Sequence, residues 1–338
     1  MPATRPILFI LVGVLLPGCW SSPAEQVVVY SALDREFSEP VLDDFTKATG
    51  IRVLAKYDDE STKSVGLTNI LIQEAGRPRC DVFWNNEILN TLRLEQKGLI
   101  DSYHSPAAAA YPEMYRSADG TWHGFAARAR ILIVNTKLVL PAERPKSIYD
   151  LADAKWKGKI GIARPIAGTT ATHVACLFAA LGEEKAVEFF RSLKANDVQI
   201  LGGNKQVAQA AASGQIAFGL TDTDDGIIEV ERASSVTIVY PDRESDNIGT
   251  LFIPNTLAII KGCPYPDRAK KLVDFLLSPA SEEKLARCES AQIPLNPAVT
   301  IQTRVETPKT VKAMPVDFAA AAAQWDAAIK FIEEEFLN

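Results

Sequence analysis

A cluster of three acidic side chains follows a short apolar strand in the second half of the sequence. Asp222, Asp224 and Asp225 come directly after residues 216–220, whose apolar run predicts a buried β-strand. Carboxylates are hard oxygen donors, which suit Fe(III), Mn, Mg and Ca alike. Three carboxylates in one place stay charged only if a cation compensates them, because like charges otherwise raise some of their pKa values. The sequence therefore predicts a cation site, against the alternative of a solvated turn that caps a helix.

A second candidate group has the chemistry to bind an anion. Gly168, Thr169 and Thr170 stand at the start of a helix predicted over residues 171–181. Free backbone N–H groups and the helix dipole favour negative charge at such a start. Ordinary capping by the threonine hydroxyls uses the same groups, so capping and anion binding both stay open here.

A metal-dependent hydrolase is the alternative from a different class of protein, because clustered aspartates can hold a metal that activates water. The sequence contains no Gly-x-Ser-x-Gly nucleophile motif. Its three histidines, His104, His123 and His173, are not near the aspartates in the sequence, which leaves no obvious general base. We therefore expect a binding protein and not an enzyme.

The elements that must position these groups alternate between strands and helices, which predicts an α/β fold with βαβ units. The chain has 338 residues, more than one hydrophobic core usually serves, so we expect two lobes. No linker rich in proline, glycine or serine separates them, which favours lobes joined by crossing strands, with hinge candidates at 125–128 and 249–253. The opening strands are predicted at 27–30, 51–55 and 81–84, the opening helices at 37–48, 62–74 and 89–97, and an extended strand pair at 123–134.

Composition excludes some classes of partner. The net charge is −6 with both signs spread along the chain, so nothing indicates a basic surface for nucleic acid. After the N-terminal region no segment reaches about 18 consecutive apolar residues, the length that a membrane span needs.

Cys263 and Cys288 flank one predicted helical segment and could form a disulfide, whereas Cys80 and Cys176 look like small buried side chains.

The N-terminus resembles a bacterial lipoprotein signal. Arg5 precedes an apolar run at 7–16 that is too short to span a bilayer, and Pro-Gly-Cys follows it. The resemblance implies a signal peptide over 1–18, cleavage before Cys19, lipidation of that thiol and a periplasmic or otherwise extracytoplasmic, lipid-anchored protein. The alternative is an ordinary secretory signal that is cleaved a few residues later.

The order of several motifs along the chain resembles the extracellular solute-binding proteins of ABC transporters, in the two-lobed type II periplasmic class and its ferric-iron-binding branch. The resemblance implies two lobes, each with a mixed, mainly parallel sheet flanked by helices, joined by two crossing strands. Lobe 1 would comprise 26–126 and 250–297, and lobe 2 would comprise 127–249 and 298–338. The motifs that carry the resemblance are Val-Tyr-Ser-Ala at 29–32, Cys-Asp-Val-Phe-Trp at 80–84, Ala-Arg-Ala-Arg at 127–130, Trp-Lys-Gly-Lys-Ile-Gly at 156–161, Gly-Gln-Ile-Ala-Phe-Gly-Leu at 214–220 and Ile-Pro-Leu-Asn at 293–296.

The same resemblance implies a set of metal ligands. Asp34 occupies the ligand position after the first strand, and Asn86, with Glu87 next to it, occupies the position after the 80–84 motif. The branch commonly has two adjacent tyrosines where this chain has Asp224 and Asp225. The sequence has no adjacent tyrosine pair, so phenolate ligation of Fe(III) is replaced by an oxygen-rich carboxylate set to which Asp222 can add another donor.

An anion site follows from the resemblance as well, because the iron-binding branch often completes the coordination with carbonate or phosphate. Arg128 stands in the position of an anion-holding arginine, and Ser61 and Thr62 open another helix on the same cleft. Thr169 and Thr170 would complete this set. If these donors hold the solute itself, the ligand would be a small oxyanion or a zwitterion such as a phosphonate.

The resulting hypothesis is a receptor of an ABC importer that captures a metal cation, Fe(III) first, between its lobes and delivers it to a membrane permease. A synergistic anion would accompany the metal, and the lobes would close around the ligand by a hinge movement. We expect a monomer that binds a small inorganic ligand, contacts no nucleic acid and touches the membrane only through its lipid anchor. An extracytoplasmic sensor for a membrane kinase would share this fold and stays open as an alternative.

Overall fold

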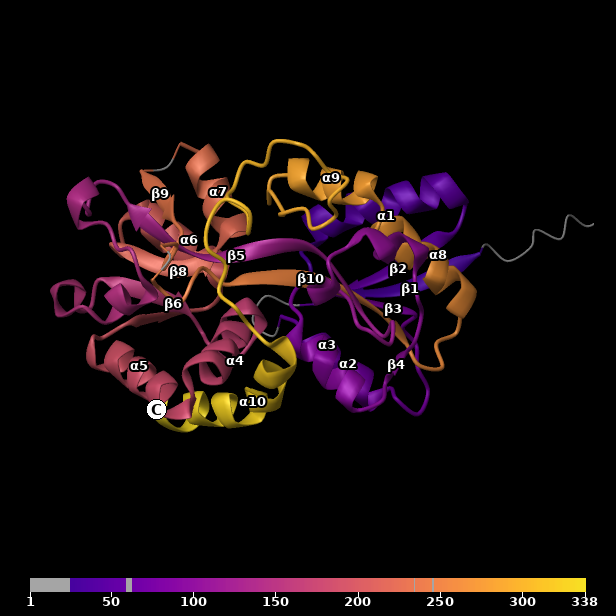
Figure 1. The fold of residues 1–338 in the computed structure, drawn as a ribbon, viewed down its shortest axis with the longest axis horizontal. Coiled ribbons are helices and arrows are strands. Elements are labelled where there is room, and N and C mark those ends of the chain that lie inside the picture. The colour runs from indigo at the N-terminus through magenta and orange to yellow at the C-terminus, as the bar shows by residue number, and fades with distance from the viewer. Residues whose placement is uncertain (1–24, 59–62, 234, 245) are drawn as a thin grey trace, which may run out of the picture.

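The strands of the protein form one long ten-stranded sheet that narrows to two strands at its centre (Figure 1). The computed structural model describes residues 25–58, 63–233, 235–244 and 246–338, so the predicted signal peptide 1–18, Cys19, Ser61 and Thr62 lie outside the described residues. The strand order is β2-β1-β3-β10-β5-β8-β6-β7, with β4 added to β10 and β9 added to β5. The strands are β1 Gln26–Ser31, β2 Arg52–Tyr57, β3 Val82–Asn85, β4 Ile100–Asp101, β5 His123–Asn135, β6 Ile160–Ala163, β7 Gln199–Leu201, β8 Phe218–Asp222, β9 Val236–Val239 and β10 Phe252–Ile260.

Two strands, β5 and β10, connect the two ends of this sheet. We call the part built on β1 to β4 lobe 1 and the part built on β6 to β9 lobe 2. The first half of β5 pairs with β10 and its second half pairs with β8 and β9. The prediction of a strand pair at 123–134 is therefore wrong: the segment is one strand that changes partners, because no turn interrupts its 13 buried residues.

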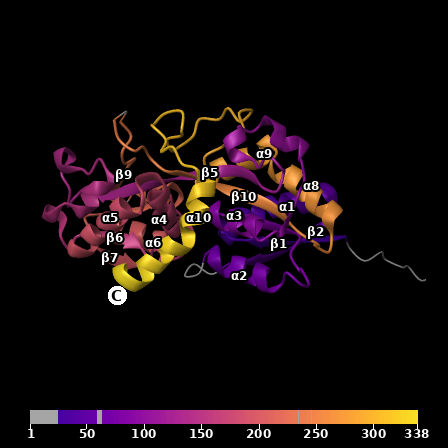
Figure 2. The same ribbon diagram turned by 60° about the horizontal axis from the view of Figure 1, so that its bottom comes forward.

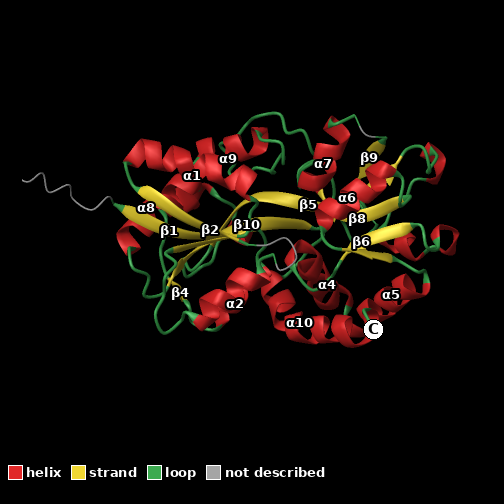
Figure 3. Ribbon diagram, turned by 180° about the vertical axis from the view of Figure 1, so that it is seen from behind, coloured by secondary structure: helices red, strands yellow, loops and turns green. Residues whose placement is uncertain are grey.

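Helices cover both faces of the sheet (Figure 3). In lobe 1, α1, α8 and α9 lie on one face and α2 and α3 on the other; in lobe 2, α6 and α7 lie on one face and α4, α5 and α10 on the other (Figure 1). Among the described helices, none is both long and apolar enough for a membrane crossing. The helices are α1 Arg35–Thr49, α2 Val65–Gln73, α3 Leu89–Gln96, α4 Gly168–Leu181, α5 Glu183–Ala195, α6 Asn204–Ser213, α7 Thr223–Glu231, α8 Pro266–Leu276, α9 Pro279–Arg287 and α10 Phe318–Phe331.

The hydrophobic core consists of two clusters, and neither coincides with a lobe: one combines the interior of lobe 1 with α6 and α7, and the other combines α3 with α4, α5 and α10. Alternate residues of β5 point to opposite faces, so Ile131 belongs to one apolar cluster and Leu132 to the other. The second cluster contains Leu89 and Leu92 of α3 together with the inner faces of α4 and α10. A helix that follows a strand of lobe 1 is thus packed into the core of lobe 2, beside α10 (Figure 2).

The crossing of β5 and β10 is held in place by a buried acid. Ala126 of β5 adopts a positive φ of 42°, which is unfavourable for a residue with a side chain. Its N–H donates to Glu282 Oε1 over 2.6 Å, and Glu282 also accepts from the N–H groups of Leu295 and Asn296. The predicted hinge segments 125–128 and 249–253 both lie at this crossing, and their hinge role and the lobe boundaries stay predictions.

Two alternatives that the sequence left open are not found in the structure. Residues 223–231 form the helix α7 and not a solvated loop, since Asp222 ends β8 and the next residue already begins the helix. Cys80, Cys176, Cys263 and Cys288 are all free thiols, so the considered pairing of Cys263 with Cys288 does not occur.

Removal of the charge on Glu282 is predicted to change how stability depends on pH. Burial raises the pKa of Glu282 above its ordinary 4.5, although its three backbone donors oppose the shift. The folded protein therefore holds this proton more tightly than the unfolded chain does. This difference contributes to the stability of the folded state, fully below about pH 4.5, and the contribution is lost as the pH rises through the pKa of the folded protein. We therefore expect the free energy of unfolding of the wild type, minus that of Glu282→Gln, to decrease as the pH rises. Denaturant titrations of both proteins from about pH 4 to about pH 8 measure this difference.

Glu283→Gln is the matched control, because Glu283 is a half-exposed carboxylate next to Glu282 on α9 that pairs with Arg287. A difference between wild type and Glu282→Gln that stays constant with pH would contradict the assignment of a raised pKa to Glu282.

Candidate functional site

A small pocket lies where the two lobes face each other. Its volume is about 30 Å³, and it is bordered by the residues that follow β1 and β3 and by the first turns of α4, α6 and α7. Most of the predicted ligand residues meet there. Those in the pocket wall are Asp34, Asn86, Arg128, Thr169, Thr170, Asp222, Asp224 and Asp225, joined by Lys63, Arg164, Gly203 and Asn204.

The three aspartates of lobe 2 form a tight cluster. Asp222 is the last residue of β8, and Asp224 and Asp225 lie in the first turn of α7, where the helix dipole favours negative charge. One carboxylate oxygen of each lies within 4.8 Å of the others. Asp222 is only 2% exposed and Asp224 only 7%, so these acids face the pocket and not bulk water.

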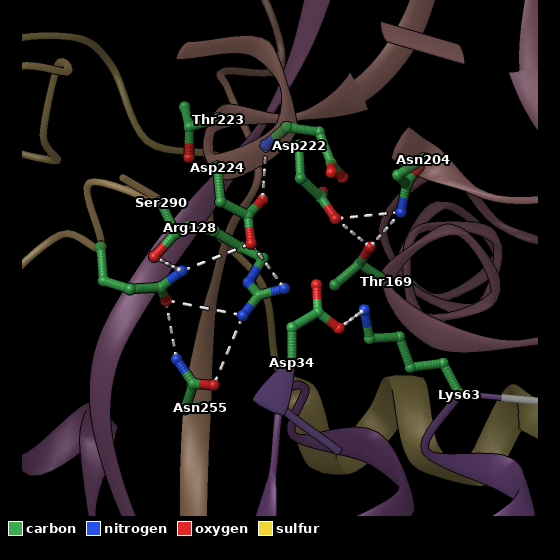
Figure 4. A network of polar contacts seen from close by, with 12 residues as sticks. Asp34, Lys63, Arg128, Thr169, Asn204, Asp222, Thr223, Asp224, Asn255 and Ser290 are labelled. Carbon is green, nitrogen blue, oxygen red and sulfur yellow. Dashed lines mark hydrogen bonds and ion pairs between the residues drawn. The ribbon is translucent and has the colours of Figure 1, made fainter. Parts of the chain in front are cut away.

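Asp222 is held by a buried arginine on the neighbouring strand. Arg130 of β5 stands opposite Asp222 in the antiparallel register, and Arg130 Nη1 lies 2.7 Å from Asp222 Oδ1. The other oxygen, Oδ2, accepts from Thr169 Oγ1 and, over 3.0 Å, from Asn204 Nδ2 (Figure 4). Both oxygens of Asp222 are therefore engaged, and the carboxylate joins β8 to the starts of α4 and α6.

Asp224 is held by Arg128, two residues earlier on β5. Arg128 Nη1 lies 3.0 Å from Asp224 Oδ2, and Gln292 Nε2 donates to the same oxygen over 3.3 Å. Arg128 Nη2 also reaches Asn255 of β10 and Gln292 at 3.4 and 3.5 Å (Figure 4). Burial raises the pKa of Asp224, and the Arg128 charge opposes that shift. Burial acts to lower the pKa of Arg128, but the neighbouring carboxylates, Asp224 first, raise it above its ordinary value.

Lobe 1 contributes an ion pair of its own. Asp34 precedes α1, and Lys63 Nζ donates to its carboxylate (Figure 4). The Lys63 carbonyl accepts from the N–H of Gly168, the first residue of α4, over 3.0 Å. This pair thus lies directly against the lobe 2 wall of the pocket.

The charges of the pocket balance. Four aspartates face three basic side chains in its wall, and Arg130 behind the wall is a fourth base. Guanidinium groups from β5 compensate Asp222 and Asp224 without a bound cation, and the need for a cation at this cluster stays a prediction.

Two helices begin at the pocket without a side-chain cap. α4 starts after Ala167 and α6 after Gly203, and neither residue has a side chain that can cap. Thr169 and Thr170 do not cap α4 either, because their hydroxyls donate to Asp222 and Asn204. Backbone N–H groups in the first turns of both helices thus remain for an anion.

Asn86 and Glu87, adjacent in the sequence, have different surroundings. Asn86 is 1% exposed and lines the pocket, and its Oδ1 has no hydrogen-bond partner in the described structure. Glu87 is fully buried outside the pocket wall, where it accepts from the backbone N–H groups of Leu89 and Asn90 and from Thr172 of α4. The structure thus brings Asn86 to the site and directs the Glu87 carboxylate to the start of α3.

Sequence reasoning did not find Lys63, Arg130, Arg164, Asn204 or Gln292. Arg128 and Arg130 did carry a signal, since two arginines at alternate positions of an otherwise apolar strand must share one face and need acidic partners. The others are single polar residues in loops or at helix starts, without a pattern that marks them.

The fold and this pocket together define a class: two α/β lobes joined by crossing strands, with a charged pocket between them. A sequence model of the bacterial extracellular solute-binding proteins matches residues 41–323, so the chain belongs to that family. The predicted resemblance to solute-binding proteins is confirmed.

Individual relatives agree with this assignment. The chain is 28% identical over 228 residues to the Fe(3+)-binding periplasmic protein of Serratia marcescens, which covers 66% of each chain. It is 26% identical over 320 residues to the major ferric iron-binding protein of Neisseria meningitidis, which covers 91% of this chain and 92% of that protein. It is also 26% identical over 271 residues to a putative 2-aminoethylphosphonate-binding periplasmic protein of Salmonella paratyphi A, which covers 78% and 77%.

The fold is shared with the crystal structure of iron-bound HitA from Pseudomonas aeruginosa. The TM-score is 0.82, over 91% of this chain and 99% of that chain, at 21% identity. This likeness confirms the predicted two-lobed fold of the periplasmic binding proteins.

Replacement of Arg130 by methionine is predicted to destabilise the protein by about 3–5 kcal/mol, because it leaves the Asp222 carboxylate buried without its counter-charge. The double variant Arg130→Met/Asp222→Asn should recover most of that loss. Denaturant titration measures both free energies. Arg287→Met is the matched control, since the Arg287 side chain is 64% exposed and pairs with Glu283 at the surface, where a cost below about 1 kcal/mol is expected. Equal losses for the two arginine variants would contradict the buried pair.

Proposed function

We propose that this protein is the extracytoplasmic receptor of an ABC importer, and that its pocket captures a ferric ion together with a small oxyanion. The carboxylate cluster of Asp222, Asp224 and Asp225, within 4.8 Å at one end of the pocket, carries this proposal. Carboxylate oxygens are hard donors that suit Fe(III).

The donors differ in how available they are. Asp224 and Asp225 from lobe 2 and Asp34 from lobe 1 would ligate the metal, with the Asn86 amide oxygen as a neutral donor from lobe 1. Both oxygens of Asp222 already accept hydrogen bonds, so Asp222 would orient the site more than it would ligate. Metal at Asp224 would compete with the Arg128 guanidinium 3.0 Å away.

The balanced charge of the pocket supports a cargo that is itself close to neutral. A bare trivalent ion would add three positive charges beside Arg128 and Lys63, at a Coulombic cost that burial makes larger. An oxyanion bound with the metal removes most of that excess. The uncapped first turns of α4 and α6, with Arg128 and Arg164 in the same wall, would hold the anion.

The size of the pocket supports an inorganic ligand. One water needs about 10–15 Å³ of cavity, so about 30 Å³ admits two or three groups of that size in this conformation. An ion with one small oxyanion approaches that limit, whereas an organic solute would need a wider separation of the lobes.

A zwitterion such as 2-aminoethylphosphonate is the second candidate. The observation that favours it is that acids and bases meet in equal number around the pocket, as a ligand with one amine and one phosphonate group would require. Its phosphonate would occupy the helix starts, and its amine would pair with Asp224 and Asp225. One of the relatives is named for this ligand.

The remaining parts of the proposal follow from family membership and the N-terminal sequence. The protein would act as a binding protein without enzymatic activity, as a monomer, and would pass its cargo to a permease in the membrane. Cys19 would carry the lipid anchor that keeps the receptor outside the cytoplasm.

Calorimetric titration of metal-free protein tests the ligand. Iron(III) nitrilotriacetate, with and without phosphate, is compared with 2-aminoethylphosphonate in metal-free buffer. We expect stoichiometric iron binding that phosphate strengthens. Asp224→Asn/Asp225→Asn should weaken it by about a hundredfold or more, which corresponds to about 2.8 kcal/mol.

Asp43→Asn is the control, because it removes an exposed carboxylate of α1 outside the pocket. Binding of the phosphonate alone would replace the iron proposal by the second candidate. Equal iron binding by wild type and the double variant would remove Asp224 and Asp225 from the ligand set.

A further inference from the structure

Glu87 carries a buried negative charge that the ligand pocket does not use. The residue is fully buried, and in the described part of the chain it has no ion pair with a basic side chain. Its charge is met by four hydrogen-bond donors instead. Three belong to its own neighbourhood: Asn85 Nδ2 at 2.7 Å and the backbone N–H groups of Leu89 and Asn90 at 2.6 and 3.1 Å. The start of the α3 dipole adds to their effect.

The fourth donor comes from the other lobe. Thr172 Oγ1 of α4 donates to Glu87 Oε2 over 2.8 Å, and both residues have no exposed surface. A hydrogen bond to a buried carboxylate is stronger than one between neutral groups, so this contact fixes α4 against α3 at one defined position.

The two ends of this contact lie next to two walls of the pocket. Asn86, which precedes Glu87, lines the pocket from lobe 1, and its amide oxygen has no hydrogen-bond partner in the described structure. Thr172 lies less than one turn after Thr169 and Thr170, which line the pocket from lobe 2. The Glu87–Thr172 bond thus sets the distance between the Asn86 wall and the first turn of α4.

The packing around the contact keeps it rigid. Leu89 and Leu92 of α3 lie in the same apolar cluster as Ala171 and Ala175 of α4. On the next turn of α3, Arg93 stacks on the ring of Trp325 in α10, at 5.0 Å from the centroid. These contacts of α3 with α4 and α10 thus hold the start of α3, and with it Glu87, where Thr172 reaches the carboxylate.

We propose that Glu87 is a positioning residue: through Thr172 it holds the uncapped start of α4 at the distance from Asn86 that a ligand bound to both lobes requires. This role rests on the proposed function of the pocket as a solute site. It replaces the ligand role that the sequence indicated for Glu87, because each oxygen of this carboxylate already accepts from two donors.

Thr172→Val tests the role with the smallest change, since it removes one hydroxyl and keeps the shape of the side chain. In the ligand-free protein we expect faster amide hydrogen exchange at the start of α4. In the binding titration with iron(III) nitrilotriacetate and phosphate we expect about tenfold weaker affinity. Thr172→Ser restores the hydroxyl and should restore both measurements.

Thr68→Val is the matched control. Thr68 is an equally buried threonine on α2, but its hydroxyl donates to the Ser64 carbonyl and not to Glu87 or its donors. It should lower overall stability without a change in exchange at the start of α4 or in affinity.

Three outcomes would overturn the proposal: unchanged exchange in Thr172→Val, faster exchange with unchanged affinity, or equal effects of Thr68→Val and Thr172→Val on both measurements. If the wild type binds neither iron nor 2-aminoethylphosphonate, the proposed function fails. Hydrogen exchange in the ligand-free protein then still decides whether Thr172 holds α4.

Discussion

Charge compensation by one strand determines the construction of this site. Arg128 and Arg130 occupy alternate positions of β5 and therefore share a face, which is the face that looks toward the pocket. Arg130 pairs with Asp222 directly across the β5–β8 register, and Arg128 pairs with Asp224 in the first turn of α7. Two carboxylates can be buried between the lobes only because β5 supplies a guanidinium to each of them. Since β5 also crosses from one lobe to the other, the counter-charges of the site and the connection between the lobes are parts of the same element.

If Asp224 and Asp225 hold the ligand, their difference from tyrosine explains why these arginines are needed. A tyrosine phenol has a pKa near 10, so a tyrosine site without metal carries no charge that must be balanced. The resemblance in sequence predicts Asp224 and Asp225 at the positions of the tyrosines of the iron-binding branch, and a carboxylate is ordinarily charged at neutral pH with or without a ligand. A buried aspartate site must therefore contain its own counter-ions, and a cation that enters must exchange with them. On the proposal that the pocket binds a cation, that exchange reduces the net gain from each carboxylate.

The sequence was sufficient for the order of the elements and for the residues that mark the ends of strands. The apolar runs at 27–30, 81–84 and 216–220 predicted strands, and the parallel arrangement of β1 and β3 brings the residues after these two strands to one edge. It was not sufficient for Lys63 or Asn204, whose roles depend on distances between segments far apart in the chain. Glu87 shows the limit most clearly, because Asn86 and Glu87 are the first two residues after β3 and yet only Asn86 lines the pocket. A single step along the chain changes the direction of the side chain, and no pattern of residue types predicts which of the two faces the site.

The packing limits the movements by which the pocket can open. The apolar clusters run from one lobe into the other, and α3 is enclosed by α4 and α10. A separation of the lobes along their common axis would expose Leu89 and Leu92, at a cost of about 1.5–3 kcal/mol for each side chain. A rotation that leaves α3 in contact with α4 avoids that cost and lets the opposite side of the pocket, where Lys205 lies 3.7 Å from Glu36, move apart. That surface ion pair contributes little in water, so it resists the rotation only weakly. The buried contact of Glu87 with Thr172 is then on the side that stays closed, where a fixed distance between the two walls of the site is compatible with movement elsewhere.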